Sequence, residues 1–139
     1  MPGAVRGGVQ GKAVQRDALQ AARRCAQVAW NKKGHDIVII DVENLISVSD
    51  YFVICTAESS SHINAIADAV VDDMKENKAG YVRIEGYKKS NWVLIDNGEV
   101  VVHVFDQQAR QFYNIENLWA DGKREKFVKR AIAKLADGQ

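Results

Sequence analysis

Apolar residues switch between helical and strand spacing along the chain. From residue 13 to 33 they recur every three or four positions, which predicts a helix that Gly34 ends in a left-handed conformation. The β-branched run DIVIIDV (36–42) and the segment DYFVICTA (50–57) then predict two strands. Because the link between them is short, the two strands should pair antiparallel.

Helical spacing returns between residues 59 and 80. Serines at its start are N-cap candidates, and Gly80 marks the expected end. The apolar positions follow an i, i+3, i+4, i+7 pattern, which predicts an amphipathic helix: Ile63, Ile66, Ala67, Val70, Val71 and Met74. YVRIE (81–85) is the expected third strand, reached through a right-handed crossover.

The segment WVLIDNGEVVVHVF (92–105) predicts a hairpin of two further strands. Asn97-Gly98 favours a two-residue type I′ turn, which places Trp92 opposite His103. Alternation then predicts one aliphatic face and one mixed face, and a four-residue loop would preserve that division. The aliphatic face holds Val93, Ile95, Val100 and Val102, and the mixed face holds Trp92, Leu94, Val101 and His103.

The C-terminal part predicts short helical turns over residues 107–119 and an amphipathic basic helix over 123–136. The pattern as a whole predicts a mixed α/β fold with a five-stranded sheet, flanking helices and this C-terminal helix. We therefore divide the chain into a flexible leader (1–12), an α/β domain (13–121) and a basic helical extension (122–139). The leader holds four glycines and the only proline.

Composition narrows the class of protein. The chain has 139 residues, the size of one domain, and no apolar run is long enough to span a membrane, so we expect a soluble intracellular protein. Cys25 and Cys55 have neither pairing nor metal spacing and are expected to be reduced core residues. Net charge is +1 overall, but residues 123–136 hold six basic side chains and one acid. That imbalance indicates an anionic neighbour or a solvated helix face.

Few residues suggest catalysis. Asp41 and Glu43 project from one face at a strand end, as the metal-binding carboxylates of nucleotidyl transferases do, so a metal-dependent enzyme of that type is the alternative function. No glycine-rich turn that would hold a triphosphate follows them. Ser61 and His62 adjoin at a helix start, where capping explains the serine. The histidines lack metal-ligand spacing, so we expect neither a metal nor another cofactor.

Two surfaces are candidates for binding. Trp92 begins a strand, and it lies either at an exposed sheet rim suited to a protein contact or in a core covered by helices. The basic residues of the C-terminal segment are candidates for contact with RNA phosphates: Lys123, Arg124, Lys126, Lys129, Arg130 and Lys134. Pattern alone leaves both questions open.

Four segments together resemble the Iojap or ribosomal silencing factor family. They are DIVIIDV, SDYFVICTAESSSHINAIAD (49–68), EG followed by WVLIDNGEVVVHVF, and ARQFYNIENLWAD (109–121). Their order and spacing match over residues 36–121. Asp50, Ser60 and His62 match recurring positions without an implied role. Many members of the family end soon after the LW motif, so the resemblance implies little about the basic extension.

The resemblance implies a five-stranded α/β domain related in topology to nucleotidyl transferases but without their catalytic groups. It also implies binding to a protein on the intersubunit face of the large ribosomal subunit, which keeps the small subunit from joining. The implied contact residues are Trp92, Val93, Leu94, His103, Arg110 and Tyr113. Ribosomal RNA would then be the anion near the basic segment, in a bacterial cytoplasm or an organelle. The hairpin face alternatively serves a homodimer of the free protein.

Overall fold

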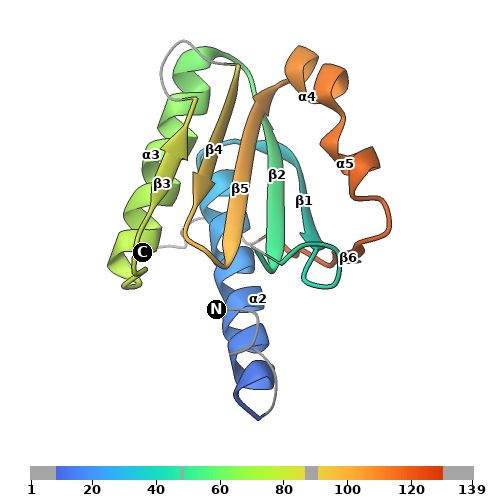
Figure 1. Cartoon of the computed structure of the whole chain (residues 1–139). Coiled ribbons are helices and arrows are strands. Elements are labelled where there is room, and N and C mark those ends of the chain that lie inside the picture. The colour runs from blue at the N-terminus through green and yellow to red at the C-terminus, as the bar shows by residue number, and fades with distance from the viewer. Residues whose placement is uncertain (1–8, 48, 87–90, 130–139) are drawn as a thin grey trace.

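The computed structural model describes residues 9–47, 49–86 and 91–129, which form a mixed β-sheet flanked by helices (Figure 1). In chain order the elements are α2 (Val9–Asn31), β1 (His35–Asp41), β2 (Tyr51–Ala57), α3 (Ser60–Glu76), β3 (Arg83–Glu85), β4 (Trp92–Asp96), β5 (Val100–Asp106), α4 (Gln107–Tyr113), α5 (Ile115–Leu118) and β6 (Lys123–Glu125). The strands lie in the order β3-β4-β5-β2-β1-β6. β2 and β5 pair parallel, and the other neighbours pair antiparallel.

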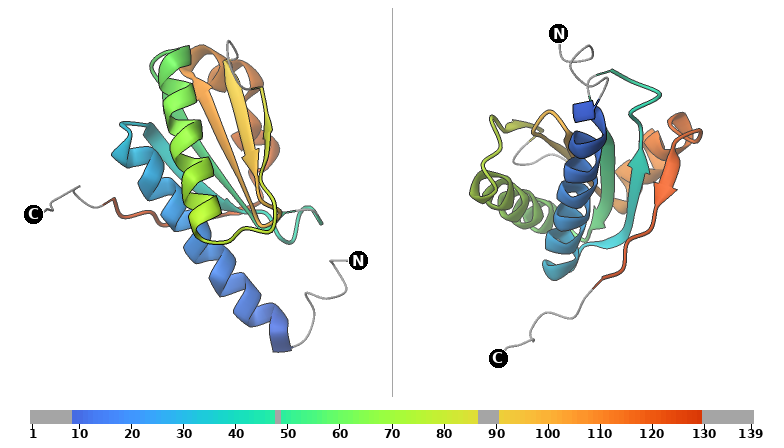
Figure 2. Two further views of the ribbon diagram at one scale, coloured as in Figure 1. Left: turned by 90° about the vertical axis from the view of Figure 1, so that its left-hand side faces the viewer. Right: turned by 90° about the horizontal axis from the view of Figure 1, so that it is seen from below.

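The helices divide between the two faces of this sheet. α2 and α3 pack side by side on one face, whereas α4 and α5 lie on the other (Figure 2). The face under α2 and α3 is aliphatic, with Ile39, Val53, Val102 and their neighbours fully buried. The face under α4 and α5 is built around aromatic rings, including Phe52 and Phe105. The mixed α/β prediction is therefore confirmed, as is the antiparallel pairing of β1 with β2.

α3 forms where its sequence predicts. Ser59 is the N-cap, and its Oγ accepts a hydrogen bond from the backbone N–H of His62 at 3.1 Å. All six apolar positions predicted for its inner face are buried. The expected stop at Gly80 is wrong, because the helix already ends at Glu76 with Asn77 as its C-cap.

α2 is longer at its start than expected, since it begins at Val9 inside the segment predicted as a leader. At its end the left-handed residue is Lys33, with φ of 70°, and Gly34 is not among the residues of positive φ. Gly34 has a different role. A Cβ there would lie 2.9 Å from the carbonyl oxygen of Ala29, so the close approach of the chain to α2 requires glycine.

The hairpin keeps its predicted faces but not its predicted register. Trp92 opposes Phe105, Leu94 opposes His103, and Asp96 opposes Val101. The register is thus displaced by two residues from the one that a type I′ turn would give. Because the displacement is even, every side chain remains on its predicted face.

Hydrogen bonds at the tip explain the longer loop. The side-chain oxygen of Asn97 accepts from the backbone N–H groups of Glu99 and Val100, at 3.0 and 2.9 Å. The carbonyl of Glu99 accepts from the N–H groups of Asp50 and Tyr51, at 2.8 and 3.1 Å. Glu99 is therefore held against the start of β2 and does not pair with Asp96.

The predicted helix over residues 123–136 is wrong at its start. Instead of starting a helix at residue 123, the chain forms β6, which pairs antiparallel with β1 and makes a sixth strand. Residues 126–129 are not helical either. The remainder of the predicted helix, residues 130–136, lies outside the described residues.

β6 reaches β1 because of the residue before it. A Cβ at Gly122 would lie 2.5 Å from a methyl carbon of Ile40 and 2.7 Å from the carbonyl oxygen of Asp41. Only glycine therefore allows this approach. Pairing with β6 satisfies backbone groups along the outer edge of β1, a gain that helical spacing in the isolated segment does not reveal.

Candidate protein-binding surface

The indole of Trp92 lies between the sheet and α4. Its ring centroid is 5.0 Å from that of Phe105 on β5, in a stacked arrangement, and 4.6 Å from that of Tyr113 on α4. The side chain is partly buried. Since β4 presents alternate residues to opposite faces, Trp92 and Leu94 both lie on the face away from α2 and α3. The sequence left open whether Trp92 lies at an exposed rim or in a covered core. In the structure one side of the indole is packed and the other is accessible.

His103 supports the indole from beneath. Its Nδ1 accepts a hydrogen bond from Nε1 of Trp92 at 3.2 Å, and the ring is only 4% exposed. Burial lowers the pKa of His103 to about 4, opposed by the charge of Asp96, so the ring is neutral near pH 7. A neutral ring that accepts at Nδ1 carries its proton on Nε2. The rings of Phe52 and His103 pack in an edge arrangement, with their centroids 4.7 Å apart, which restrains the plane of the imidazole.

Exposed apolar side chains continue from the indole onto α4 and α5. Tyr113 is 46% exposed, and Phe112 beside it is 80% exposed, with their ring centroids 5.0 Å apart. Leu118 on α5 is 70% exposed. We call the accessible parts of Trp92, Leu94, Phe112 and Tyr113 the aromatic surface. Large apolar groups left in water at adjacent positions are typical of a site that another macromolecule covers.

Phe112 and Leu118 were not among the predicted site residues. On one continuous helix, residues 112, 115 and 118 would share a face. In the structure Asn114 is left-handed, with φ of 46° and ψ of 49°, and separates α4 from α5. Ile115 is consequently buried while Phe112 and Leu118 are exposed. The signal in the sequence is Asn114 itself, because asparagine tolerates this conformation.

Arg110, for which the resemblance implied a contact role, has a side chain that is 14% exposed and whose guanidinium is engaged within the fold. Its Nε and Nη2 donate to the two carboxylate oxygens of Glu116, at 2.9 and 3.0 Å. Its Nη1 donates to Oγ1 of Thr56 at 2.8 Å and to the carbonyl of Asp36 at 2.5 Å. Arg110 therefore connects α4 with α5 and with the ends of β1 and β2. It holds the aromatic surface in place from within.

Val93 is also excluded from the surface. It is fully buried among the aliphatic residues on the opposite face of the sheet, so its side chain is not available to a partner. Trp92, Leu94 and Tyr113 are the predicted contact residues that the structure brings together with accessible atoms. His103 belongs to the cluster but acts beneath the surface.

The residues considered for catalysis have structural contacts. Oδ1 of Asp41 accepts from the backbone N–H of Glu43 at 3.1 Å, as in a turn at the end of a strand. Nδ1 of His62 accepts from the N–H of Glu58 at 2.9 Å, and Nε2 lies 2.7 Å from the carbonyl of Lys32. With both ring nitrogens engaged by the backbone, His62 is not arranged to activate Ser61. Over the described ranges, no three His, Cys, Asp or Glu side chains are placed to hold a metal ion.

The cysteines are free thiols, as predicted. Burial raises the pKa of both Cys25 and Cys55 to about 12, so neither is a reactive thiolate near neutral pH. Among the described residues, no helix has the length and apolar character needed to cross a membrane.

The candidate RNA-contacting side chains spread over β6 and the residues after it. Lys123 and Arg124 belong to β6, on opposite faces of the strand. Lys126 follows, and Nζ of Lys129 lies 5.9 Å above the ring of Trp30 on α2. Arg130 and Lys134 are outside the described residues.

Comparisons with known proteins agree on one family. The family described as "Ribosomal silencing factor during starvation" matches residues 15–137, which includes the basic segment that the resemblance had left unmatched. The ribosomal silencing factor RsfS of Bacillus subtilis is 42% identical over 91 residues, covering 66% of this chain and 77% of the relative. The chloroplastic protein Iojap of Arabidopsis thaliana is 35% identical over 105 residues, covering 76% of this chain and 44% of the relative.

Two solved structures share the fold. A crystal structure of a protein from Chromobacterium violaceum superposes with a TM-score of 0.69 at 30% identity, covering 87% of this chain and 98% of the other. A structure from Bacillus halodurans gives a TM-score of 0.67 at 33% identity, covering 81% of this chain and 99% of the other.

Proposed function

The chain belongs to the ribosomal silencing factor family, and we propose that it binds a protein on the intersubunit face of the large ribosomal subunit and thereby prevents the small subunit from joining. Translation is repressed because subunits held apart cannot initiate. The relatives named as ribosomal silencing factors support a ribosomal partner.

The observation that carries this proposal is the aromatic surface. It combines the start of β4, where the motif tryptophan lies, with α4, which exposes Phe112 and Tyr113 beside Trp92. Tryptophan and tyrosine bury a large area with few rotatable bonds and keep a polar group, which suits them to the centre of a protein interface. Arg110 and His103 hold the surface rigid, so little conformational entropy is lost on docking.

The proposed mechanism is steric and needs no reaction. Apolar burial supplies the affinity, and the bulk of the domain occupies space that the small subunit requires. No cofactor takes part.

The C-terminal cations would add a contact with ribosomal RNA. Lys123 and Arg124 on β6 have strongly exposed side chains, and Arg124 lies beside Glu116 of α5, next to the helices that carry the aromatic surface. The RNA contact made by Arg124 would thus adjoin the protein contact on the α4–α5 side of the sheet.

The same apolar surface would serve a homodimer when the protein is free. Self-association would cover Phe112 and Tyr113 until a ribosome competes for them. Light scattering reports the dimer, and added large subunits should dissociate it if the two interfaces overlap. Named relatives are bacterial, chloroplastic and mitochondrial, so we place the protein beside ribosomes of a bacterial cytoplasm or of an organelle.

Sedimentation with purified ribosomal subunits tests the proposal. The protein should travel with large subunits alone, and adding it before small subunits should lower the yield of joined ribosomes. Adding it after joining should have less effect. Equal binding to both subunits, or binding without any effect on joining, would contradict the mechanism.

A further inference from the structure

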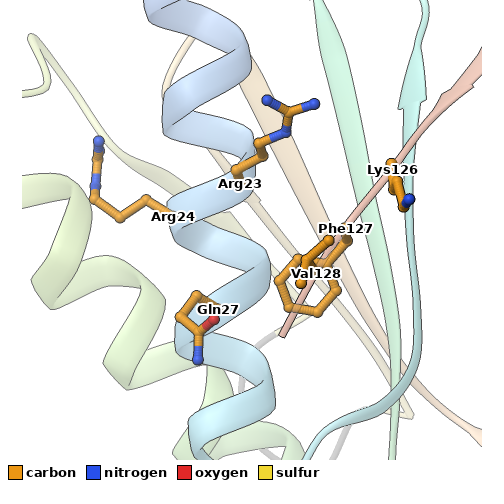
Figure 3. Close-up of a pocket in the computed structure, with 6 residues that line it drawn as sticks. All are labelled: Arg23, Arg24, Gln27, Lys126, Phe127 and Val128. Carbon is orange, nitrogen blue, oxygen red and sulfur yellow. The ribbon is translucent and has the colours of Figure 1, made fainter. Parts of the chain in front are cut away.

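A groove of about 530 Å³ runs between α2 and the segment that follows β6 (Figure 3). Its lining combines cations with apolar groups: Arg23, Arg24, Gln27, Lys126, Phe127 and Val128. The α2 side chains were not among the predicted site residues. We call this feature the α2–tail groove.

Several contacts hold the segment after β6, which forms the wall opposite α2, in place. β6 pairs with β1, and Glu125 at its end lies 3.8 Å from Arg23. Phe127 packs against the aliphatic core under α2 and α3. Two residues later, Lys129 lies over Trp30 of α2. The segment therefore follows α2 for several residues after the strand ends, and the groove is part of the folded structure.

The charge of the groove favours an anion. Three of its six lining residues are cationic and none is acidic. Arg24 turns toward α3, where Asp73 accepts from its Nε at 2.9 Å, so its charge is largely balanced. Among the described residues, the ion pair of Arg23 is with Glu125, at 3.8 Å, and Glu125 is the same distance from Lys123, so its charge is shared. Lys126 has no ion pair within the described part of the chain. Arg23 and Lys126 are thus the two charges available to a ligand.

Two features of the surroundings suit an extended polyanion better than a compact one. β6 is the outermost strand, so one side of its backbone is not paired within the described sheet and offers N–H donors to phosphates. Phe127 and the exposed Val128 provide an apolar wall against which a ribose can pack.

The far side of α2 has the opposite character. The groove between α2 and α3 is lined by Asp68, Asp72, Asp73 and Glu76 with a single cation, Lys32. A polyanion is repelled there and attracted to the α2–tail groove. This asymmetry orients the domain on a charged surface.

We propose that the α2–tail groove binds the sugar–phosphate backbone of RNA, with Arg23 and Lys126 on successive phosphates. The proposal rests on the proposed function, since ribosomal RNA is the polyanion that a large-subunit protein contact would bring within reach. It adds α2 to the RNA contact and identifies where the backbone lies.

Direct binding to a labelled RNA oligonucleotide tests the groove. Fluorescence anisotropy would compare the wild-type chain with Arg23→Glu/Lys126→Glu at several salt concentrations. Losing two phosphate contacts should weaken binding about tenfold or more and reduce the slope of log K against log salt by about 1 to 2. Arg23→Gln/Lys126→Gln, with a smaller effect in the same direction, covers the case in which the charge reversal disturbs folding.

Lys75→Glu/Lys78→Glu is the matched control, because it makes the same change of net charge at exposed positions on α3 and the turn after it. If the control weakens RNA binding as much as the groove variants do, the effect is one of net charge and the groove proposal fails. Groove variants that bind RNA like the wild type, with an unchanged salt slope, overturn it too.

Large subunits provide the second readout and separate the two proposals. One outcome is that the groove variants lose RNA binding while the wild-type protein does not bind large subunits. That result would contradict the proposed function and still support the groove assignment. Groove-dependent binding to large subunits without any binding to RNA would indicate an acidic protein as the ligand, and would overturn the RNA assignment alone.

Discussion

The two faces of the sheet are made from the same strands and differ in kind. Under α2 and α3, β4 and β5 contribute Val93, Ile95 and Val102, which are fully buried and carry no polar atoms. On the other face the same strands contribute Trp92 and His103, whose rings are related by a hydrogen bond and by stacking on their neighbours. Alternation along a strand thus separates two kinds of packing by a single residue.

The comparison shows how stability and binding are divided. Aliphatic burial is non-directional, so the covered face stabilises the fold without fixing any exposed group. The aromatic face fixes the orientation of an indole that is partly in water. It does so by burying a neutral histidine whose Nε2 has no hydrogen-bond partner among the residues that the structure describes. Such a buried polar atom destabilises the fold, which is consistent with a face maintained for function.

A cavity under α2 and α3 tests whether the two faces differ in their contribution to stability. Ile66 on α3 is fully buried, so Ile66→Ala should lower the free energy of unfolding by about 3 kcal/mol. Phe112→Ala removes a larger side chain from the other face, but that side chain is 80% exposed, and stability should change by about 0.5 kcal/mol or less. Urea denaturation measures both. Equal losses would mean that Phe112 is packed and that the aromatic surface is misassigned.

For binding to large subunits, substitutions on the aromatic face should have the larger effect. Trp92→Ala should weaken binding to large subunits by about 2 kcal/mol, roughly thirtyfold, if the indole is a central anchor. Ile66→Val, which leaves the aromatic surface intact, is the control and should bind like the wild type. Quantitative sedimentation measures the affinity, with circular dichroism to establish that each variant is folded. A folded Trp92→Ala protein with wild-type affinity would remove Trp92 from the site.

The same contrast shows which features the sequence could predict. The faces of β4 and β5 follow from alternation, which is local, and so does the inner face of α3. The hairpin register depends on the carbonyl of Glu99 being held by Asp50 and Tyr51, about 50 residues away in the chain. Local turn preference favoured the shorter loop, and a non-local hydrogen bond overrode it.

Edges and exposed sites were harder to predict for a related reason. β6 exists because β1 offers an unpaired edge and Gly122 allows close approach, while its own residues have a helical pattern. The family resemblance implied contact roles for Trp92, Tyr113 and Arg110 alike, and it could not tell that the Arg110 guanidinium has its partners within the fold. Burial and pairing decide that question, and neither is visible in a motif.

A pH titration examines the aromatic face alone. The pKa of His103 is about 4 in the folded protein and about 6.5 unfolded, so the unfolded state binds more protons between these values. The stability contributed by neutral His103 is present above pH 6.5 and is lost as pH falls toward 4, by about 2 kcal/mol between pH 7 and pH 5.

His103→Gln cannot titrate and is the matched reference. The difference in unfolding free energy between wild type and His103→Gln should shrink over this range, as measured by urea denaturation at each pH. A difference that stays constant would show that His103 is accessible to protons in the folded state. In the folded protein, Trp92 fluorescence should change only around pH 4, because protonation of His103 at Nδ1 then removes the acceptor of the indole N–H.

The smallest effect concerns how the aromatic surface is held. Arg110→Lys keeps the charge but loses the paired hydrogen bonds to Glu116 across the α4–α5 junction, so affinity for large subunits should fall by about 1 kcal/mol, roughly fivefold. Gln111→Ala, an exposed neighbour on α4, should have little effect. If Arg110 acts through Glu116, then Arg110→Lys should have little further effect once Glu116→Gln is present. Fully additive losses would instead mean that Arg110 touches the partner, which is the role that the motif implied and the contacts of its guanidinium argue against.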